Sequence, residues 1–208
     1  MSATDLARWT ALWKTAGAKG DCESWHSRLV TLYSEPGRHY HNLRHLEECL
    51  NEFESARSLA RDPLAVEFAL WFHDAVYDTQ AKDNEERSAA LSRDCFLQSG
   101  LSPAFANWVA NLIMGTKHAE TSKDPDAALV TDIDLSILGR DANRFQEYEA
   151  QIRQEYSWVP VEAFAAGRSK ILQQFLSRPR IYFHDAFFAK YESQARANIQ
   201  GSLLKLTR

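Results

Sequence analysis

Apolar residues recur at a helical period along almost the whole chain. In the first such segment, Leu6, Trp9, Leu12 and Trp13 fall on one face of a helix. The eight glycines and six prolines lie mostly between the periodic segments, and no Asn-Gly or Asp-Gly hairpin turn occurs. The pattern therefore predicts helices over residues 5–15, 22–34, 41–59, 62–72, 83–98, 102–115, 127–138, 141–156, 161–177 and 183–206, with a loop over 118–126.

These elements predict an all-α fold. At about 150 residues per domain, the length of 208 residues fits one large domain or two small ones. We expect a single helical domain over residues 1–208, with the candidate site motifs within 41–135 and additional C-terminal helices over 141–206. The segment Leu64–Phe72 is apolar nearly all round, which is typical of a central buried helix.

Composition narrows the classes of protein and partner. Apolar residues make up 45% of the chain, which is enough for a sizeable core, and the net charge of -4 argues against a nucleic-acid polymer as the main partner. The three cysteines, Cys22, Cys49 and Cys95, form neither a disulfide framework nor a paired zinc motif, which favours a reducing, cytoplasmic compartment. No apolar run of about 18 residues occurs, and Asp5 and Arg8 argue against a signal peptide, so we expect no membrane association.

Imidazole and carboxylate groups cluster in two short segments of the first half of the chain. His41 and His45 are four residues apart, so on a helix they lie on one face and can reach one site. His73 and Asp74 follow the apolar helix directly, and burying them without partners costs a few kcal/mol. Metal coordination satisfies both groups; a capping aspartate beside a histidine bonded to a backbone carbonyl is the alternative.

A third segment adds two carboxylates to an otherwise apolar helix. Asp132 and Asp134 are two residues apart and point to different helical faces, so one of them is expected to enter a given site, while Asp132 alone could serve as a helix cap. Mixed imidazole and carboxylate ligands suit Mn²⁺, Fe²⁺, Zn²⁺ or Mg²⁺. We expect the cysteines to lie away from these residues, which weakens the case for a structural zinc site.

In order along the chain, these motifs resemble the H…HD…D pattern of the HD superfamily of metal-dependent phosphohydrolases, and the whole chain resembles a small bacterial subfamily of predicted HD phosphohydrolases. The resemblance implies an HD-type helical bundle that binds one divalent metal ion, such as Mn, Mg, Co, Zn or Fe. It also implies four metal ligands, His45, His73, Asp74 and Asp134. The stretches that carry it are RHYHNLRH at 38–45, WFHDAVYD at 71–78, NEERSA at 84–89 and DIDLSILG at 132–139.

The resemblance also implies catalytic roles. His41 occupies the position of the proton-donating histidine in the YHNxxH stretch of cyclic-nucleotide phosphodiesterases. Alarmone hydrolases carry HDxxED, but Tyr77 stands here where they have Glu, so Asp78 or Glu85 is expected to position the nucleophile, with Glu86 as an alternative. The alternative explanation for both glutamates is favourable charge in a first helical turn.

The resulting hypothesis is a phosphohydrolase that acts on a small phosphate ester, such as a nucleotide or related metabolite. Arg38, Arg44, Lys117 and His118 are the candidates for binding the remaining phosphate charge. A metal-binding regulatory module and an HD-type iron oxygenase are the alternatives, and a homodimer is left open. The second His-Asp pair, His184-Asp185, is interpreted as structural.

Overall fold

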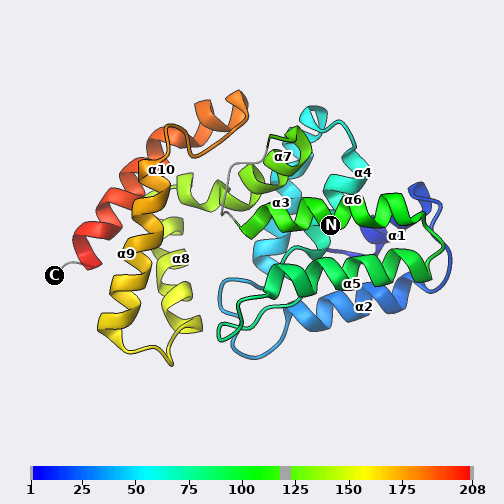
Figure 1. Ribbon diagram of the computed structural model, residues 1–208, viewed down its shortest axis with the longest axis horizontal. Coiled ribbons are helices and arrows are strands. Elements are labelled where there is room, and N and C mark those ends of the chain that lie inside the picture. The colour runs from blue at the N-terminus through cyan, green and yellow to red at the C-terminus, as the bar shows by residue number, and fades with distance from the viewer. Residues whose placement is uncertain (1, 118–122, 207–208) are drawn as a thin grey trace. The chain divides into compact units, whose positions relative to one another are not determined.

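The computed structural model describes residues 2–117 and 123–206, and within these residues it contains helices and no strand (Figure 1). The all-α prediction is confirmed. None of the described helices is both long and apolar enough to cross a membrane. The α-helices are α1 (Leu6–Thr15), α2 (Cys22–Tyr33), α3 (Leu43–Ala56), α4 (Pro63–Phe72), α5 (Asn84–Gln98), α6 (Pro103–Met114), α7 (Pro125–Asp134), α8 (Ala142–Glu155), α9 (Val161–Ser177) and α10 (Asp185–Leu206); the short 3₁₀ helices are η1 (Arg57–Leu59), η2 (Gly115–Lys117) and η3 (Leu135–Gly139).

Capping residues set most of the helix starts where the sequence predicts them. The side chains of Asp5, Asp21, Asp62 and Ser102 each accept a hydrogen bond from the backbone N–H three residues later, which satisfies one of the unpaired donors of the first turn. Asp185 is the first residue of α10, as its structural interpretation requires.

Two predicted helices are shorter than expected. The helix predicted from His41 to Leu59 begins at Leu43, because Asn42 has an extended backbone and its side chain caps the N–H of Arg44; its last residues form η1. His41 therefore precedes the helix instead of sharing a face with His45. The helix predicted over 127–138 begins at Pro125 and gives way to η3 after Asp134. Of the predicted loop, residues 118–122 lie outside the described residues.

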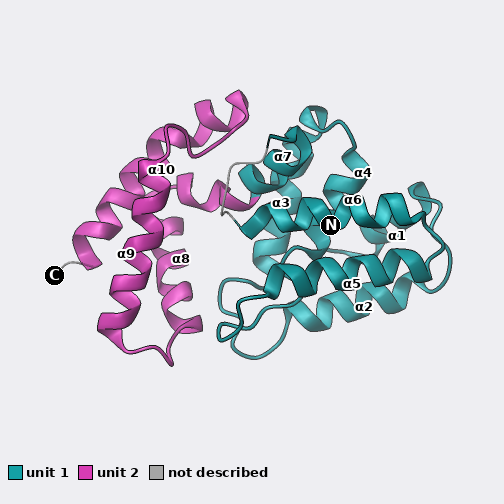
Figure 2. Cartoon of the chain, viewed as in Figure 1, with its two compact units in different colours: residues 1–133 teal, residues 134–208 magenta. Residues whose placement is uncertain are grey.

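The chain forms two compact units, residues 1–133 and 134–208 (Figure 2). The boundary falls just before Asp134, the last residue of α7. A single domain of 208 residues stays a prediction, and each unit is described by itself.

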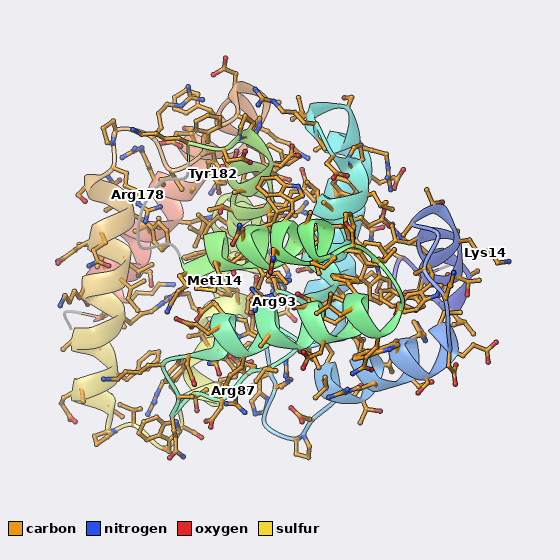
Figure 3. The ribbon with its side chains drawn as sticks, turned by 45° about the vertical axis from the view of Figure 1, so that its right-hand side comes forward. Lys14, Arg87, Arg93, Met114, Arg178 and Tyr182 are labelled. Atoms are coloured by element: carbon orange, nitrogen blue, oxygen red, sulfur yellow. The ribbon has the colours of Figure 1, made fainter. Side chains whose placement is uncertain are left out.

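The core of the first unit is α4. Every residue from Ala65 to Phe72 is buried, in agreement with the apolar pattern, and α4 packs against α1, α3, α5 and α6. The Trp9 ring lies edge-on against Trp71 at a centroid distance of 5.1 Å, a geometry that stabilises aromatic pairs beyond simple burial. Helices α5 and α6 lie side by side, and Arg93 Nε donates to Asn107 Oδ1 between them at 2.8 Å (Figure 3).

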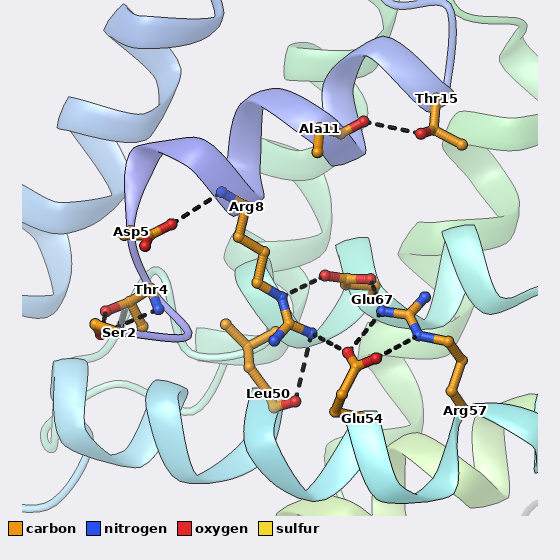
Figure 4. A network of polar contacts seen from close by, with 10 residues as sticks. All are labelled: Ser2, Thr4, Asp5, Arg8, Ala11, Thr15, Leu50, Glu54, Arg57 and Glu67. Carbon is orange, nitrogen blue, oxygen red and sulfur yellow. Dashed lines mark hydrogen bonds and ion pairs between the residues drawn. The ribbon is translucent and has the colours of Figure 1, made fainter.

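One charged residue, Glu67, interrupts the buried surface of α4. Its carboxylate accepts from Arg8 Nε of α1 at 2.7 Å and from Arg57 Nη2 of η1 at 2.6 Å (Figure 4). Glu54 of α3 pairs with both arginines as well. An unpaired carboxylate buried here would cost several kcal/mol, so the two arginines are needed to fold α1 and η1 onto α4.

In the second unit, α10 packs closely on η3. The hydroxyl of Tyr182 donates to the carbonyl of Leu135 at 2.9 Å, and Asn198 Nδ2 donates to the carbonyls of Leu138 and Arg140, both at 2.8 Å. Gly139 lies where any side chain would collide with α10. A Cβ there would be 2.6 Å from Cβ of Tyr191 and 2.7 Å from its carbonyl oxygen.

We predict that Gly139→Ala destabilises the protein and that Gly167→Ala does not. The added methyl group at 139 forces α10 away from η3, which we expect to lower the free energy of unfolding by about 1–3 kcal/mol. Gly167, inside α9, has open space around its Cβ position, so alanine should stabilise that helix by up to about 1 kcal/mol. Urea unfolding of both variants checks this; equal stability of the two would contradict the packing described.

Candidate metal centre

Three side-chain atoms from two of the sequence motifs converge in the first unit. Nε2 of His45 lies 3.0 Å from Nε2 of His73, and Oδ2 of Asp74 lies 3.3 Å and 3.1 Å from these two nitrogens. Both histidines are buried. The sequence therefore brings one imidazole from the first turn of α3 and a His-Asp pair from the end of α4 to one point.

Local structure explains the position of each group. The Asn42 cap fixes the start of α3, three residues before His45. His73 is the C-cap of α4, and the backbone N–H of Asp74 donates to the hydroxyl of the buried Tyr33 at 3.2 Å. The turn that follows α4 is thus stabilised by a hydrogen bond to Tyr33 of α2.

A backbone hydrogen bond fixes the tautomer of His73. Its Nδ1 lies 2.8 Å from the carbonyl oxygen of Leu70, and a carbonyl can only accept, so Nδ1 carries the proton. In the neutral ring, Nε2 then presents its lone pair to His45 and Asp74. Metal-ligating histidines commonly donate their second nitrogen to a carbonyl in this way. The backbone-bonded alternative for His73 and the metal-ligand hypothesis are therefore compatible.

Asp134 and Cys49 extend the cluster. One ligand atom from each of His45, Cys49, His73 and Asp134 lies within 4.8 Å of the others, a group that could hold a metal ion. Asp134 is the last residue of α7, whereas Asp132 lies buried within that helix and so is not its cap. Cys49 corrects the expectation that the cysteines lie away from the site. It follows His45 by one helical turn, and its Sγ is 3.7 Å from His45 Nδ1.

The geometry of the cluster fits a divalent cation. At metal–ligand bond lengths of about 2.1 Å, neighbouring ligand atoms of a tetrahedral or octahedral site lie about 3.0–3.4 Å apart. The three distances among His45, His73 and Asp74 fall in that range. Imidazole and carboxylate donors suit Mn, Fe, Zn or Mg, and a thiolate from Cys49 would favour Zn or another softer ion.

The electrostatics keep Asp74 ionised. Burial raises the pKa of its carboxyl, but the neighbouring imidazoles of His73 and His41, together with a hydrogen bond from His45, hold that pKa well below its usual range. Burial raises the pKa of the Tyr33 hydroxyl to about 12, so this residue stays a neutral hydrogen-bond partner. A negative charge therefore faces the two imidazoles at neutral pH.

The predicted catalytic residues lie at the edge of this cluster or beyond it. The His41 ring is 5.8 Å from the His45 ring and stacks on Tyr77 at 4.1 Å. Asp78 is exposed, and its Oδ1 accepts from the N–H of Gln80 at 2.9 Å. Glu85 lies in the first turn of α5, as does Glu86.

The predicted phosphate-binding residues have diverse environments. Arg44 is half exposed and pairs with Glu48 at 3.4 Å, and Lys117 pairs with Glu86. His118 lies outside the described residues. These two cations remain accessible, but each is already partly neutralised by an acidic partner, so their role toward phosphate stays a prediction.

Arg38 has a different environment, because its side chain is buried beside the cluster. It donates to the carbonyls of Asp74 at 2.6 Å, Ala75 at 2.9 Å and His41 at 3.0 Å. Its guanidinium also lies over the Tyr33 and Tyr77 rings. Arg38 thereby ties the segment before α3 to the turn after α4, a role that no sequence motif indicated.

Comparison with known proteins adds no relative to this description: no family model matches the chain, and no curated protein or solved structure shows significant similarity to it. The resemblance to HD phosphohydrolases therefore depends on the sequence motifs alone and stays an expectation.

We predict that Asp134→Asn weakens metal binding while Asp132→Asn does not. The amide removes the charge of a ligand candidate at unchanged size, which should weaken affinity at least about tenfold, since even outer-shell changes cost about 10–100-fold. Asp132 lies two residues away on another face of α7, outside the cluster. Equilibrium dialysis of both variants against Mn²⁺ and Zn²⁺, with metal analysis, measures this. Equal loss in both would remove Asp134 from the site.

We also predict that Arg38→Lys weakens metal affinity by about tenfold, because a lysine ammonium cannot reproduce the planar fork that holds three carbonyls. Arg28→Lys on the exposed side of α2 serves as the control. If Arg38 instead bound phosphate directly, its variant would keep normal metal affinity, and competitive inhibition by inorganic phosphate would weaken.

Proposed function

We propose that the protein is a metal-dependent phosphohydrolase that acts on a small phosphate ester, such as a nucleotide or related metabolite. The convergence of His45, His73 and Asp74 within 3.0–3.3 Å is the observation that carries the proposal. Asp134 lies in one group with His45, Cys49 and His73. One divalent ion fits these residues. It would supply a lowered pKa for water and a positive charge for a phosphoryl oxygen.

The remaining chemistry falls to side chains around the cluster. His41 lies beside His45 and would donate a proton to the leaving oxygen. Asp78 and Glu85 are the candidates to accept a proton from the nucleophile. Arg44 and Lys117 would neutralise the outer phosphate oxygens, since both side chains are partly exposed. Local cations in an acidic chain suit a small anion better than a polymer.

A metal-binding regulatory module without hydrolysis is the second candidate. The observation that favours it is Tyr77, whose ring stacks on His41 at the position where HDxxE enzymes carry a glutamate. That stack covers one face of the proposed proton donor with a group that cannot act as a base at neutral pH.

The test is hydrolysis by protein stripped of metal and reloaded with Mn²⁺, Co²⁺, Mg²⁺, Zn²⁺ or Fe²⁺, with release of inorganic phosphate measured over a panel of nucleotides and sugar phosphates. We expect turnover with at least one metal, and a loss of about 100-fold or more in kcat for His41→Ala at unchanged metal content. His184→Ala, which alters the other His-Asp pair, is the control.

Metal-loaded protein that releases no phosphate from any ester would overturn the hydrolase proposal. In that case the regulatory module predicts that His73→Ala abolishes metal binding and lowers the melting temperature, with no activity to lose.

A further inference from the structure

A pocket lined by several charged side chains lies in the first unit, away from the metal centre. It has a volume of about 540 Å³, and its walls come from α1, from the end of α3 with η1, and from the start of α4. Such a volume is typical of small-molecule sites. Three arginines line it, Arg8, Arg57 and Arg61, together with apolar atoms of Ala11 and Leu64.

The buried carboxylate of Glu67 fixes two of these arginines. Arg8 uses Nε and Arg57 uses Nη2 to bind it, and the Glu67 side chain is only 4% exposed (Figure 4). For Nη1 of both arginines, and for the whole Arg61 guanidinium, no partner exists among the described residues. Glu67 therefore holds two guanidiniums in place while leaving part of each free to bind another group, which lowers the entropy cost of binding a ligand there.

The acidic residues of the pocket do not offer a cation site. Both oxygens of Glu67 are occupied by arginines, and Asp62 caps α4 by accepting from the N–H of Ala65. Glu54 is the most exposed of the three, with a side chain 58% exposed, and it pairs with Arg8 and Arg57. Its carboxylate forms ion pairs with the guanidiniums of Arg8 and Arg57, the same groups that an external oxyanion would bind. The positive end of the α4 dipole adds to this preference for an anion.

The pocket is separate from the metal centre. Its residues lie at the end of α3 and the start of α4, whereas His45 lies at the start of α3 and His73 just after α4 ends. The twelve residues from His45 to Arg57 span about 18 Å of helix at 1.5 Å per residue. A ligand in this pocket would contact the same two helices that carry the metal-ligand candidates, at their opposite ends.

We propose that the pocket formed by Arg8, Arg57 and Arg61 binds the phosphate group of a small phosphorylated molecule, with Glu54 as a carboxylate that competes for the same guanidiniums. A phosphate dianion offers several oxygens to the free N–H groups of three arginines, and charge-assisted bonds of this type are among the strongest hydrogen bonds in proteins. The inference is independent of the proposed hydrolase activity.

The experiment measures binding of inorganic phosphate to the full chain by calorimetry, at constant ionic strength with chloride as the reference anion. Arg61→Ala should weaken the phosphate Kd by about tenfold, the loss expected for one charge-assisted contact. Arg61 is exposed and its side chain has no partner in the described part of the chain, so this variant should fold normally. Glu54→Gln should tighten the Kd several-fold, because it removes the competing charge. Arg87→Ala, an exposed arginine on α5, is the control.

Further outcomes distinguish phosphate binding in the pocket from binding at the metal centre, and from a purely structural role of the arginines. Phosphate binding that persists in Asp134→Asn and weakens in Arg61→Ala supports the pocket. Binding lost in Asp134→Asn but unchanged in Arg61→Ala assigns the phosphate to the metal centre and overturns the proposal. An absence of phosphate binding, or weaker binding in Glu54→Gln, also overturns it and leaves the arginines with a structural role alone.

Discussion

The burial of α4 is the constraint on which the rest of the first unit depends. A helix that is apolar nearly all round must be covered on every side, and α1, α3, α5 and α6 do this. Such a helix can tolerate polar groups only where partners reach them. Glu67 forms ion pairs with two arginines. His73, just past the helix, contacts His45, and Arg38 donates a hydrogen bond to the backbone carbonyl of Asp74. The two polar clusters of the unit are thus consequences of one buried helix.

The candidate metal centre has an electrostatic imbalance of its own. Nε2 of His45 and Nε2 of His73 are 3.0 Å apart, and two lone pairs that face each other at this distance repel. The hydrogen bond from His73 Nδ1 to Leu70 already leaves a lone pair on Nε2 of His73. A proton on His45, shared with Asp74, relieves this repulsion, and a divalent cation would relieve it more completely. Because the ring orientation is fixed by backbone groups, the cluster is arranged before any cation arrives, which lowers the cost of binding one.

Most of the fold followed from the sequence because its determinants are local. Helical periodicity and the caps at Asp5, Asp62 and Ser102 act over three or four residues and need no tertiary knowledge. His41 shows where this fails. Its spacing from His45 fits a helix, yet the Asn42 side chain caps the first turn of α3, so the helix begins between the two histidines. An Asn side chain that bonds to a nearby backbone N–H favours a helix start over a continuous helix.

The site was harder to predict, for two physical reasons. Cys49 carried a local signal, since it follows His45 by four residues, and attention to the helical spacing of the cysteines would have found it. Arg38 carried none. Its hydrogen bonds go to the carbonyls of Asp74 and Ala75, and backbone acceptors have the same chemistry at every residue. Only the folded chain shows that these two carbonyls belong to the turn that presents Asp74.

Tyr77 places a constraint on any proton acceptor in this site. In the HDxxE arrangement the acid would project from the turn after α4, but here that position holds a ring stacked on His41. Asp78 is next in line, yet its carboxylate accepts from the N–H of Gln80 and its backbone is bonded to the side chain of Asn84 on both sides, so it is committed to the turn. Glu85 starts the following helix and has no such commitment to a turn. Under the proposed hydrolase function, Glu85 of α5 is therefore the less committed of the two candidate proton acceptors.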